Sequence, residues 1–328
     1  MWAGGPLLAA ILGGASAATA DDAASRLEEA RAHLQAGRYE EAARAFALAA
    51  REKGSGCSEC LFGEATARLR LGDAKAARKL AERGLPLLQS DPGQLAAAYN
   101  LLGFALAREA GNRKDRLSDA AEAFRSSLAA DPDNPMARLN LGIILLRVSR
   151  DEEGLAELRV FLERWPQDPG ADRARLYVQN PRRARERFAP DFSVRTLQGE
   201  DISLASLRGR TVVLDFWGTW CPPCVASLPE LKDLLRKYAT DRLVLLSVSV
   251  GDEDEAWREF VAKKGMTWPQ YRDADRRLVE AFQVRAYPTY VVIDGEGAIL
   301  DQLQGLDESH SLAYRLRSRL DAILDAKR

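Results

Sequence analysis

Four cysteines form two pairs with the same spacing, Cys57 with Cys60 and Cys221 with Cys224. Each pair can close a local disulfide or work as a dithiol, because its two sulfurs lie about one helical turn apart. A thiolate is the nucleophile of disulfide exchange, and a helix N-terminus stabilises its negative charge. The chain has two histidines, and both lie away from the cysteine pairs in sequence. We therefore expect disulfide chemistry, with no metal site and no cofactor.

The second pair lies in the run Trp220-Cys221-Pro222-Pro223-Cys224. A buried strand is predicted just before it, over 212–217, and a helix just after it, over 223–238. Cys221 should therefore stand at a helix N-terminus as the nucleophile, with a partly exposed sulfur. Cys224, one turn further on, is placed to resolve a mixed disulfide. Pro222 and Pro223 fix φ and remove two N–H donors that would have no partner in the first turn.

Other elements of the second half indicate a mixed α/β fold. They are a β-hairpin over 192–197 and 202–204, a buried strand over 243–250, an antiparallel pair over 290–293 and 298–304, and a closing amphipathic helix over 310–326. The strands at 212–217 and 243–250 enclose the helix that follows the cysteines, which makes a β-α-β unit with parallel strands. The predicted fold is a mixed central sheet flanked by helices.

Three segments in this half share a specific pattern: LASLRG at 204–209, FWGTWCPPC at 216–224 and YPT at 287–289. Together they resemble the TlpA/ResA-type thioredoxin-like family, over residues 189–328, and 251–284 fits the insertion of that family. Its members are extracytoplasmic disulfide reductases, and several serve cytochrome c maturation. The resemblance implies a thioredoxin fold, a disulfide-bearing protein as substrate, and an upstream dithiol as reductant.

The resemblance also implies roles for individual residues. Cys221 becomes the nucleophile and Cys224 the resolving cysteine, and a cis peptide before Pro288 lies against their disulfide. Trp217, Trp220, Pro222, Pro223 and Thr289 are the supporting residues of the same motifs.

Asp215 is the predicted acid–base group of the dithiol. It stands in the middle of a buried strand, where an unpaired charge is costly, and six residues before Cys221 (221 − 215), as the buried Asp of thioredoxins does. Many TlpA/ResA-type proteins instead carry a Glu three residues after the second cysteine, where this chain has Ser227. The alternative is a structural Asp215 that bonds to neighbouring donors.

Residues 22–166 show a repeated helical pattern in four units. Gly37 and Gly72 begin matching turns, and small residues such as Gly103 and Gly142 let paired helices approach each other. The pattern resembles the tetratricopeptide repeat family, which implies an all-α solenoid with a groove for a protein partner. A rigid spacer is the alternative. Two departures are an insertion over 112–117, expected to lengthen a turn, and Ser149 in place of the fourth turn glycine.

A polar helix with a break at Asn180-Pro181 is predicted in the linker, 167–188. Four arginines cluster there: Arg182, Arg183, Arg185 and Arg187. We expect a solvated helix that caps the last repeat, with a contact to an anionic surface as the alternative.

The run from Pro6 to Ala20 is apolar or small and ends in Ala18-Thr19-Ala20, which is typical of a signal peptide over residues 1–20. We expect an exported, periplasmic or extracytoplasmic protein, with an uncleaved anchor as the alternative. The formal net charge of −1 offers no broad basic field, so nucleic acid is not an expected partner.

The first cysteine pair lacks a preceding strand and follows the flexible run Gly54-Ser55-Gly56. A local structural disulfide between Cys57 and Cys60 is expected, with a second redox relay and a free dithiol as alternatives.

The sequence thus predicts a thiol-disulfide oxidoreductase that reduces protein disulfides. One alternative is a peroxiredoxin-like thiol peroxidase, which shares the fold but does not need the second cysteine of the motif. The other is a repeat scaffold whose redox domain is vestigial.

Overall fold

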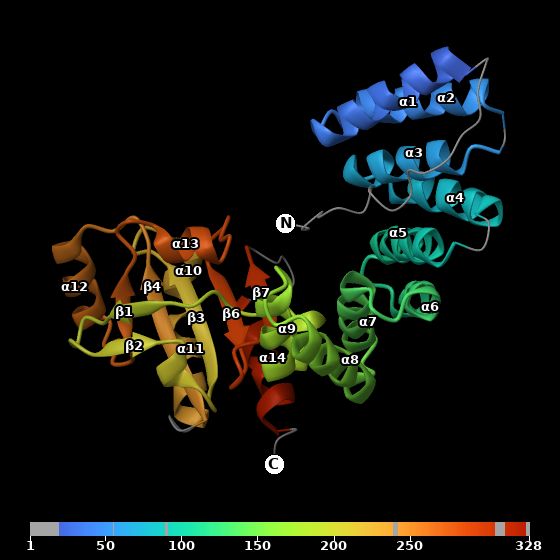
Figure 1. Ribbon diagram of the computed structural model, residues 1–328. Coiled ribbons are helices and arrows are strands. Elements are labelled where there is room, and N and C mark those ends of the chain that lie inside the picture. Colours follow the sequence, from blue (N-terminus) through green and yellow to red (C-terminus); the bar gives the residue numbers. More distant parts are fainter. Residues whose placement is uncertain (1–19, 55, 89–90, 239–241, 306–311, 326–328) are drawn as a thin grey trace. The chain divides into compact units, whose positions relative to one another are not determined.

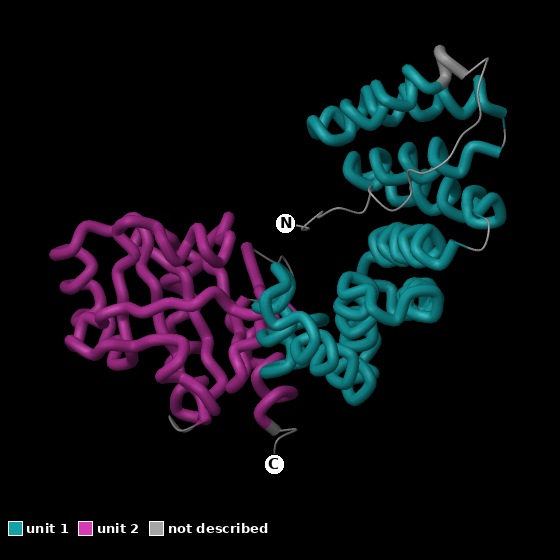
Figure 2. The backbone as a smooth tube through the Cα atoms, viewed as in Figure 1, with its two compact units in different colours: residues 1–185 teal, residues 186–328 magenta. Residues whose placement is uncertain are grey.

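The computed structural model describes residues 20–54, 56–88, 91–238, 242–305 and 312–325. It divides into two compact units, residues 1–185 and 186–328, which are coloured separately in Figure 2. The expected signal peptide lies outside the described residues, apart from Ala20, where the first helix begins. No helix in the described ranges combines the length and the apolar character needed to cross a membrane.

The first unit consists of antiparallel helix pairs (Figure 1). Its helices are α1 (Ala20–Gln35), α2 (Tyr39–Glu52), α3 (Ser58–Arg70), α4 (Ala74–Gly84), α5 (Pro92–Ala110), α6 (Lys114–Ala130), α7 (Pro135–Arg147), α8 (Asp151–Arg164) and α9 (Ala171–Gln179), with 3-10 helices η1 (Leu85–Leu87) and η2 (Pro181–Ala184). Each helix packs mainly on the helices before and after it in the chain, as in a solenoid.

Small residues set the spacing inside each pair. A Cβ at Gly103 of α5 would lie 2.7 Å from the Phe124 ring of α6, and one at Gly142 of α7 would lie 2.8 Å from Leu158 of α8. Contacts this short do not occur between real side chains, so the bulky residue of the second helix fills the space that the glycine leaves.

The turns within the pairs need a left-handed residue. Gly37, Gly72 and Gly111 adopt φ values of 73°, 90° and 58°, and Ser149 takes the same role at φ 66°. The insertion expected to lengthen the third turn does not do so, because only residues 111–113 lie between α5 and α6. The extra residues instead lengthen those two helices, to 19 and 17 residues.

Helix α9 and η2 complete the first unit. Ala171 and Ala174 are buried against Leu146 and Phe161 of the last repeat. Arg185 forms a two-pronged ion pair with Asp151, at 2.6 and 2.9 Å, and donates to the carbonyl of Leu146. The segment formed by α9 and η2 therefore packs on the last repeat through Ala171, Ala174 and Arg185.

The second unit has a five-stranded mixed sheet and a separate hairpin. Its elements are β1 (Ser193–Arg195), β2 (Asp201–Ser203), η3 (Ala205–Leu207), β3 (Thr211–Trp217), α10 (Pro222–Ala226), α11 (Leu228–Lys237), β4 (Leu243–Ser249), α12 (Asp254–Lys263), β5 (Gln270–Arg272), α13 (Arg277–Ala281), β6 (Thr289–Ile293), β7 (Ile299–Gln304) and α14 (Leu312–Asp325). The strand order is β5-β4-β3-β6-β7, with β1 paired to β2 alone. Strand β3 runs parallel to β4 and antiparallel to β6.

The two faces of this sheet bury different clusters. Val213, Trp217 and Tyr290 pack with α11, α12 and α14 on one face. Leu214 and Phe216 pack with the β1–β2 hairpin and α13 on the other. Because side chains alternate along a strand, Asp215 points to the first face, which also holds both cysteines of the motif.

Two elements differ from the sequence expectation. The helix predicted over 223–238 is two helices that meet at Ser227, because Pro229 has no N–H and its ring disfavours a continuous helix. The edge strand β5 pairs with the end of β4 and was not expected.

Candidate active site

Cys221 and Cys224 form a disulfide at the start of α10, with their Cα atoms 5.3 Å apart. Cys221 is the N-cap residue, and its Sγ accepts a hydrogen bond from the backbone N–H of Cys224 at 3.3 Å. Each cysteine is only 3% exposed. The partly exposed Cys221 sulfur expected from the sequence is therefore absent in this oxidised state, because both sulfurs pack into the apolar cluster around Trp217.

A buried carboxylate ties the loop before Cys221 to the end of the neighbouring strand. Asp252 accepts hydrogen bonds from the Thr219 hydroxyl at 2.6 Å and from the Thr219 N–H at 3.2 Å. It also accepts from the Ser249 hydroxyl at 2.6 Å. Three donors converge on one carboxylate, which fixes the backbone that leads into the disulfide.

Trp220 is the large exposed residue beside the disulfide, at 54%. Its ring is nevertheless held in place, because Nε1 donates to the Val250 carbonyl at 2.8 Å. The Tyr287 ring meets it edge-on, with centroids 5.4 Å apart. A Cβ at Gly218 would lie 2.4 Å from Trp220 Nε1, so this ring position requires glycine there.

The Tyr287–Pro288 peptide bond is cis, as the resemblance implied. Pro288 directly precedes β6, and its carbonyl accepts from the Gly305 N–H at 3.2 Å. Thr289 is fully buried, and its hydroxyl donates to the Ala286 carbonyl at 2.6 Å. Trp217 is 1% exposed and belongs to the core, so of the two tryptophans predicted as supporting residues only Trp220 reaches the surface.

Asp215 is buried on the cysteine-bearing face of the sheet, at 2% exposure. The Ser247 hydroxyl donates to its Oδ2 at 2.7 Å, and Trp268 Nε1 in turn donates to that hydroxyl oxygen at 2.8 Å. Burial raises the pKa of Asp215 to about 7, and the bond from Ser247 opposes this rise. A group with that pKa can exchange a proton near neutral pH.

Tyr290 is the residue opposite Asp215 in the register of β3 and β6. Its hydroxyl is buried and interacts with the Ser227 side chain, which favours the ionised phenol. Burial, together with the Asp215 carboxyl, raises the pKa of Tyr290, so the phenol stays neutral beside the acid.

Ser247, Asp252, Trp268 and Tyr290 are site residues that the sequence analysis did not single out. The available signal was modest: Ser247 and Ser249 are hydroxyl residues inside an otherwise apolar strand, LVLLSVS. Hydroxyls in a buried strand need partners, and here those partners are Asp215 and Asp252.

Cys57 and Cys60 also form a disulfide, in the first unit. Cys57 is the N-cap residue of α3, and its sulfur accepts from the Cys60 N–H at 3.2 Å. The local geometry resembles that of the second pair, but the described residues before it contain no strand, and Cys60 is fully buried.

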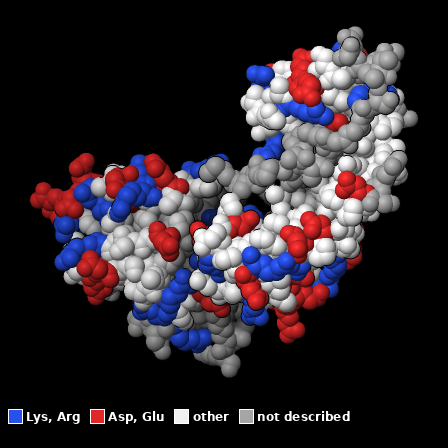
Figure 3. All heavy atoms as spheres, viewed as in Figure 1, with Lys and Arg blue, Asp and Glu red and all other residues white. Residues whose placement is uncertain are grey.

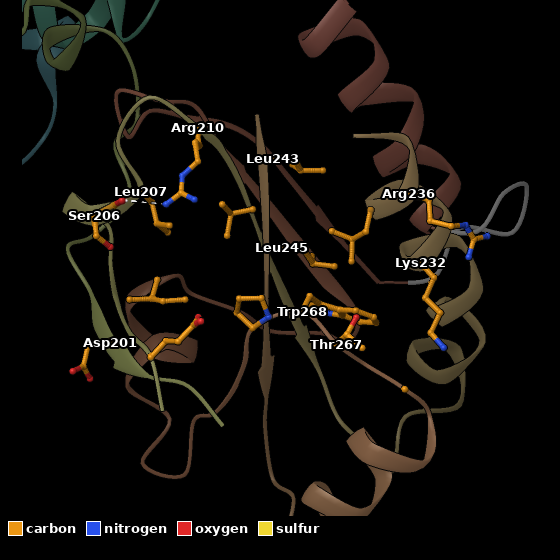
Figure 4. Close-up of a pocket in the computed structure, with 16 residues that line it drawn as sticks. Asp201, Ser206, Leu207, Arg210, Lys232, Arg236, Leu243, Leu245, Thr267 and Trp268 are labelled. Atoms are coloured by element: carbon orange, nitrogen blue, oxygen red, sulfur yellow. Dashed lines mark hydrogen bonds between the residues drawn. The ribbon is translucent and has the colours of Figure 1, made fainter. Parts of the chain in front are cut away.

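A cavity of about 850 Å³ in the second unit lies apart from the disulfide (Figure 4). It is bordered by Asp201 and Arg210 on one side, by Lys232 and Arg236 of α11 on the other, and by the beginning of β4. The cysteines follow the carboxyl end of β3, whereas this cavity borders the opposite end of the parallel strands. The cavity therefore includes neither cysteine, although Trp268, which donates to Ser247, is one of its lining residues.

Charges of both signs are interspersed on the face that Figure 3 shows. Several ion pairs join two residues of the same helix, such as Arg258 with Asp254 and Arg175 with Asp172. This distribution agrees with the near-zero net charge.

Comparison with known proteins identifies the family of the chain. The tetratricopeptide repeat model matches residues 27–94 and 104–169, and the AhpC/TSA family model matches residues 186–302. Thiol-disulfide oxidoreductase ResA of Bacillus thuringiensis (strain Al Hakam) is 33% identical over 129 residues, which are 39% of this chain and 75% of the relative. The chain belongs to the ResA-type thiol-disulfide oxidoreductases.

ResA of Geobacillus kaustophilus (strain HTA426) is 32% identical over 130 residues, 40% of this chain and 75% of the relative. A solved structure described as a putative thiol:disulfide interchange protein DsbE from Chlorobium tepidum is 25% identical, covers 41% of this chain and 95% of its own, and has a TM-score of 0.38. The predicted fold class is confirmed: helical repeats precede a thioredoxin-like domain, and this ResA-type chain is an enzyme of disulfide exchange.

Proposed function

We propose that this protein is an extracytoplasmic reductase of protein disulfides that works through Cys221 and Cys224. The observation that carries the proposal is the position of the pair: Cys221 caps α10 directly after β3, beside the exposed ring of Trp220. A sulfur at a helix N-terminus is favoured as thiolate, and an exposed aromatic ring beside it offers a surface to a substrate protein.

In the proposed cycle, the Cys221 thiolate attacks one sulfur of a substrate disulfide. The substrate disulfide breaks, a mixed disulfide forms at Cys221, and one substrate thiolate leaves. Cys224 then loses its proton and attacks Cys221 Sγ, which releases the second substrate thiolate and leaves the Cys221–Cys224 disulfide. Two electrons have passed to the substrate, and a dithiol reductant must supply two electrons to restore the enzyme.

Asp215 is the proposed acceptor of the Cys224 proton. It faces the same side of the sheet as the cysteines, and its pKa of about 7 suits a base that works near neutral pH. The cis peptide before Pro288 is proposed to lie against the disulfide, with Trp217, Trp220, Pro222, Pro223 and Thr289 in support.

The proposed organisation is a signal peptide over 1–20, four tetratricopeptide repeats over 22–166, a linker over 167–188 and the redox domain over 189–328. The repeat domain would bind a protein partner. The family resemblance supports the further proposal of a place in cytochrome c maturation, which requires that the proposed signal peptide exports the protein. Cys57–Cys60 is proposed as a structural disulfide of the repeat domain.

The test is reduction of insulin disulfides with dithiothreitol as the electron source. We expect Cys221→Ser to abolish the catalysed rate, and Cys57→Ser combined with Cys60→Ser to retain most of it. Cys224→Ser should accumulate a mixed disulfide with the substrate, which mass spectrometry detects. If the Cys57/Cys60 variant loses activity and Cys221→Ser keeps it, the working pair is wrongly assigned; rapid peroxide consumption by the wild type would favour a thiol peroxidase.

A further inference from the structure

The repeat domain contains a cavity of about 360 Å³, which we call the arginine pocket. Its main lining residues are Phe104 of α5, Asn140, Ile143 and Arg147 of α7, and Arg173 and Tyr177 of α9. All of them belong to the first unit. Because Arg173 and Tyr177 come from the helix after the repeats, this pocket exists only where α9 packs beside the last repeat.

Arg147 brings a positive charge to the pocket without a carboxylate partner. Its Nη2 donates to the Gly111 carbonyl and, at 3.4 Å, to the Asn112 side-chain oxygen. No carboxylate of the described residues lies within 4.0 Å of it. Burial lowers the pKa of Arg147, which means that the cation is only partly compensated where it stands.

Arg173 is the second cation of the pocket. Its Nε is buried and has no hydrogen-bond partner within the described part of the chain, and it forms no ion pair there. Arg138 and Arg185 of the same region do have acidic partners, Glu157 and Asp151. A buried N–H of a charged group without an acceptor is costly. Arg138 Nε lacks an acceptor too, so the feature that sets Arg173 apart is that no acidic side chain of the described residues pairs with its guanidinium.

We infer that the arginine pocket binds a carboxylate of an acidic peptide segment from a partner protein. A carboxylate matches the guanidinium fork and supplies the acceptor that Arg173 Nε lacks. Phe104, Ile143 and Tyr177 form an apolar wall beside the two cations, which fits an apolar side chain next to the acidic one. The complementary charge and the mixed lining favour a short acidic and apolar peptide over a nucleic acid, which would need a wider basic surface.

This inference rests on the proposed partner-binding role of the repeat domain and not on the disulfide chemistry. The two can therefore fail separately. Substitutions in the pocket should leave insulin reduction unchanged. A wild-type protein that does not reduce insulin would count against the redox proposal alone.

The probe is a random library of acetylated octapeptides in two sets, one with C-terminal amides and one with free C-terminal carboxylates. The full-length protein selects binders, and fluorescence anisotropy measures the affinity of the enriched peptides. We expect enrichment of Asp or Glu beside an apolar residue. Enrichment in the amide set identifies a side-chain carboxylate, and enrichment confined to the other set identifies a terminal one; both support the pocket.

Arg147→Gln and Arg173→Gln should each weaken the binding of the enriched peptide at least about tenfold, since bonds to charged groups contribute about 1.5–3 kcal/mol. Arg175→Gln is the matched control: it lies on α9 too, but it is exposed and paired with Asp172, so affinity should stay the same. Circular dichroism of Arg147→Gln and Arg173→Gln checks that both variants keep the fold. Absence of acidic enrichment, equal affinity in the arginine variants, or equal displacement by a short oligothymidine would overturn the proposal.

Discussion

At the scale of single residues, the burial of Asp215 couples its protonation to folding. Its pKa is about 7 in the folded protein, compared with about 3.9 for an unperturbed Asp. The folded state therefore holds this proton more tightly than the unfolded state. The contribution to stability is fully present below pH ~4 and is lost as the pH rises through 7.

We predict that this loss is measurable in the oxidised protein. Between pH 4 and pH 8 the free energy of unfolding of the wild type should fall by up to about 4 kcal/mol more than that of Asp215→Asn, because the amide does not titrate. Urea denaturation at several pH values, with the difference between the two proteins plotted against pH, measures it. A flat difference would mean that Asp215 stays ionised and that its bond from Ser247 outweighs its burial.

The same variant separates the two interpretations of Asp215 in catalysis. If Asp215 accepts the Cys224 proton, the rate of mixed-disulfide resolution in single turnover should rise through pH 7 in the wild type and lose this rise in Asp215→Asn. Equal pH profiles would leave Asp215 with a structural role only.

Cys221, Cys224 and the cis peptide at Pro288 could be predicted from sequence because they lie in short contiguous motifs. Ser247 and Asp252 could not, since their roles depend on which strands become neighbours. The same holds for Arg147 and Arg173. Nothing local in the sequence indicates that two arginines on different helices will share one pocket without an acid.

At the scale of elements, the dithiol depends on two adjacent loops. The loop after β3 carries Thr219 and Trp220, and the segment after β4 carries Val250 and Asp252. Because β3 and β4 are parallel neighbours, both segments emerge at the same edge of the sheet, and side-chain bonds can join them. The position of Cys221 is thus fixed from the neighbouring strand as well as from its own.

We predict that Asp252→Asn lowers the stability of the oxidised protein by about 1–3 kcal/mol and slows insulin reduction. The amide replaces one accepting oxygen by an N–H₂ group, which leaves buried donors of Thr219 or Ser249 without an acceptor. Asp254→Asn is the control, since that exposed residue pairs only with surface arginines, and such pairs contribute about 0–1 kcal/mol. Equal effects of both substitutions would show that the Asp252 bonds do not hold the loop.

Most elements could be predicted because their periodicity is strong: the repeat helices and the apolar strands at 212–217 and 243–250 are examples. The strand β5 has three residues, too few for a period to appear. The break at Ser227 is caused by Pro229. The sequence alone did not predict it, because a proline early in a helical stretch is compatible with one continuous helix or with the start of a new helix. In the third repeat, extra residues could enter a turn or a helix, and only the packing of α5 on α6 decides.

At the scale of the whole molecule, the two units differ in how far apart in sequence their contacting residues lie. The repeat unit is built from contacts between consecutive helices, and the redox unit from strands that are distant in sequence. In the repeat unit each helix packs on its neighbours in sequence, so its stability is close to a sum of local terms. In the redox unit the central strand β3 pairs with β6, whose residues lie 73 (289 − 216) to 81 (293 − 212) positions later in the chain. The two units should therefore fold by different routes and independently of each other.

We predict that the fragment 22–187 folds alone into a nearly all-helical protein. It contains the helices of the first unit, with α1 from residue 22 onward, and the Arg185–Asp151 ion pair that fixes the end of the solenoid. Its far-ultraviolet circular dichroism should show helical minima and a cooperative thermal transition. The fragment 189–328 is the comparison, and it should show mixed helix and sheet. A spectrum of 22–187 dominated by coil or sheet, or a gradual melt, would mean that the repeats need the redox unit to fold.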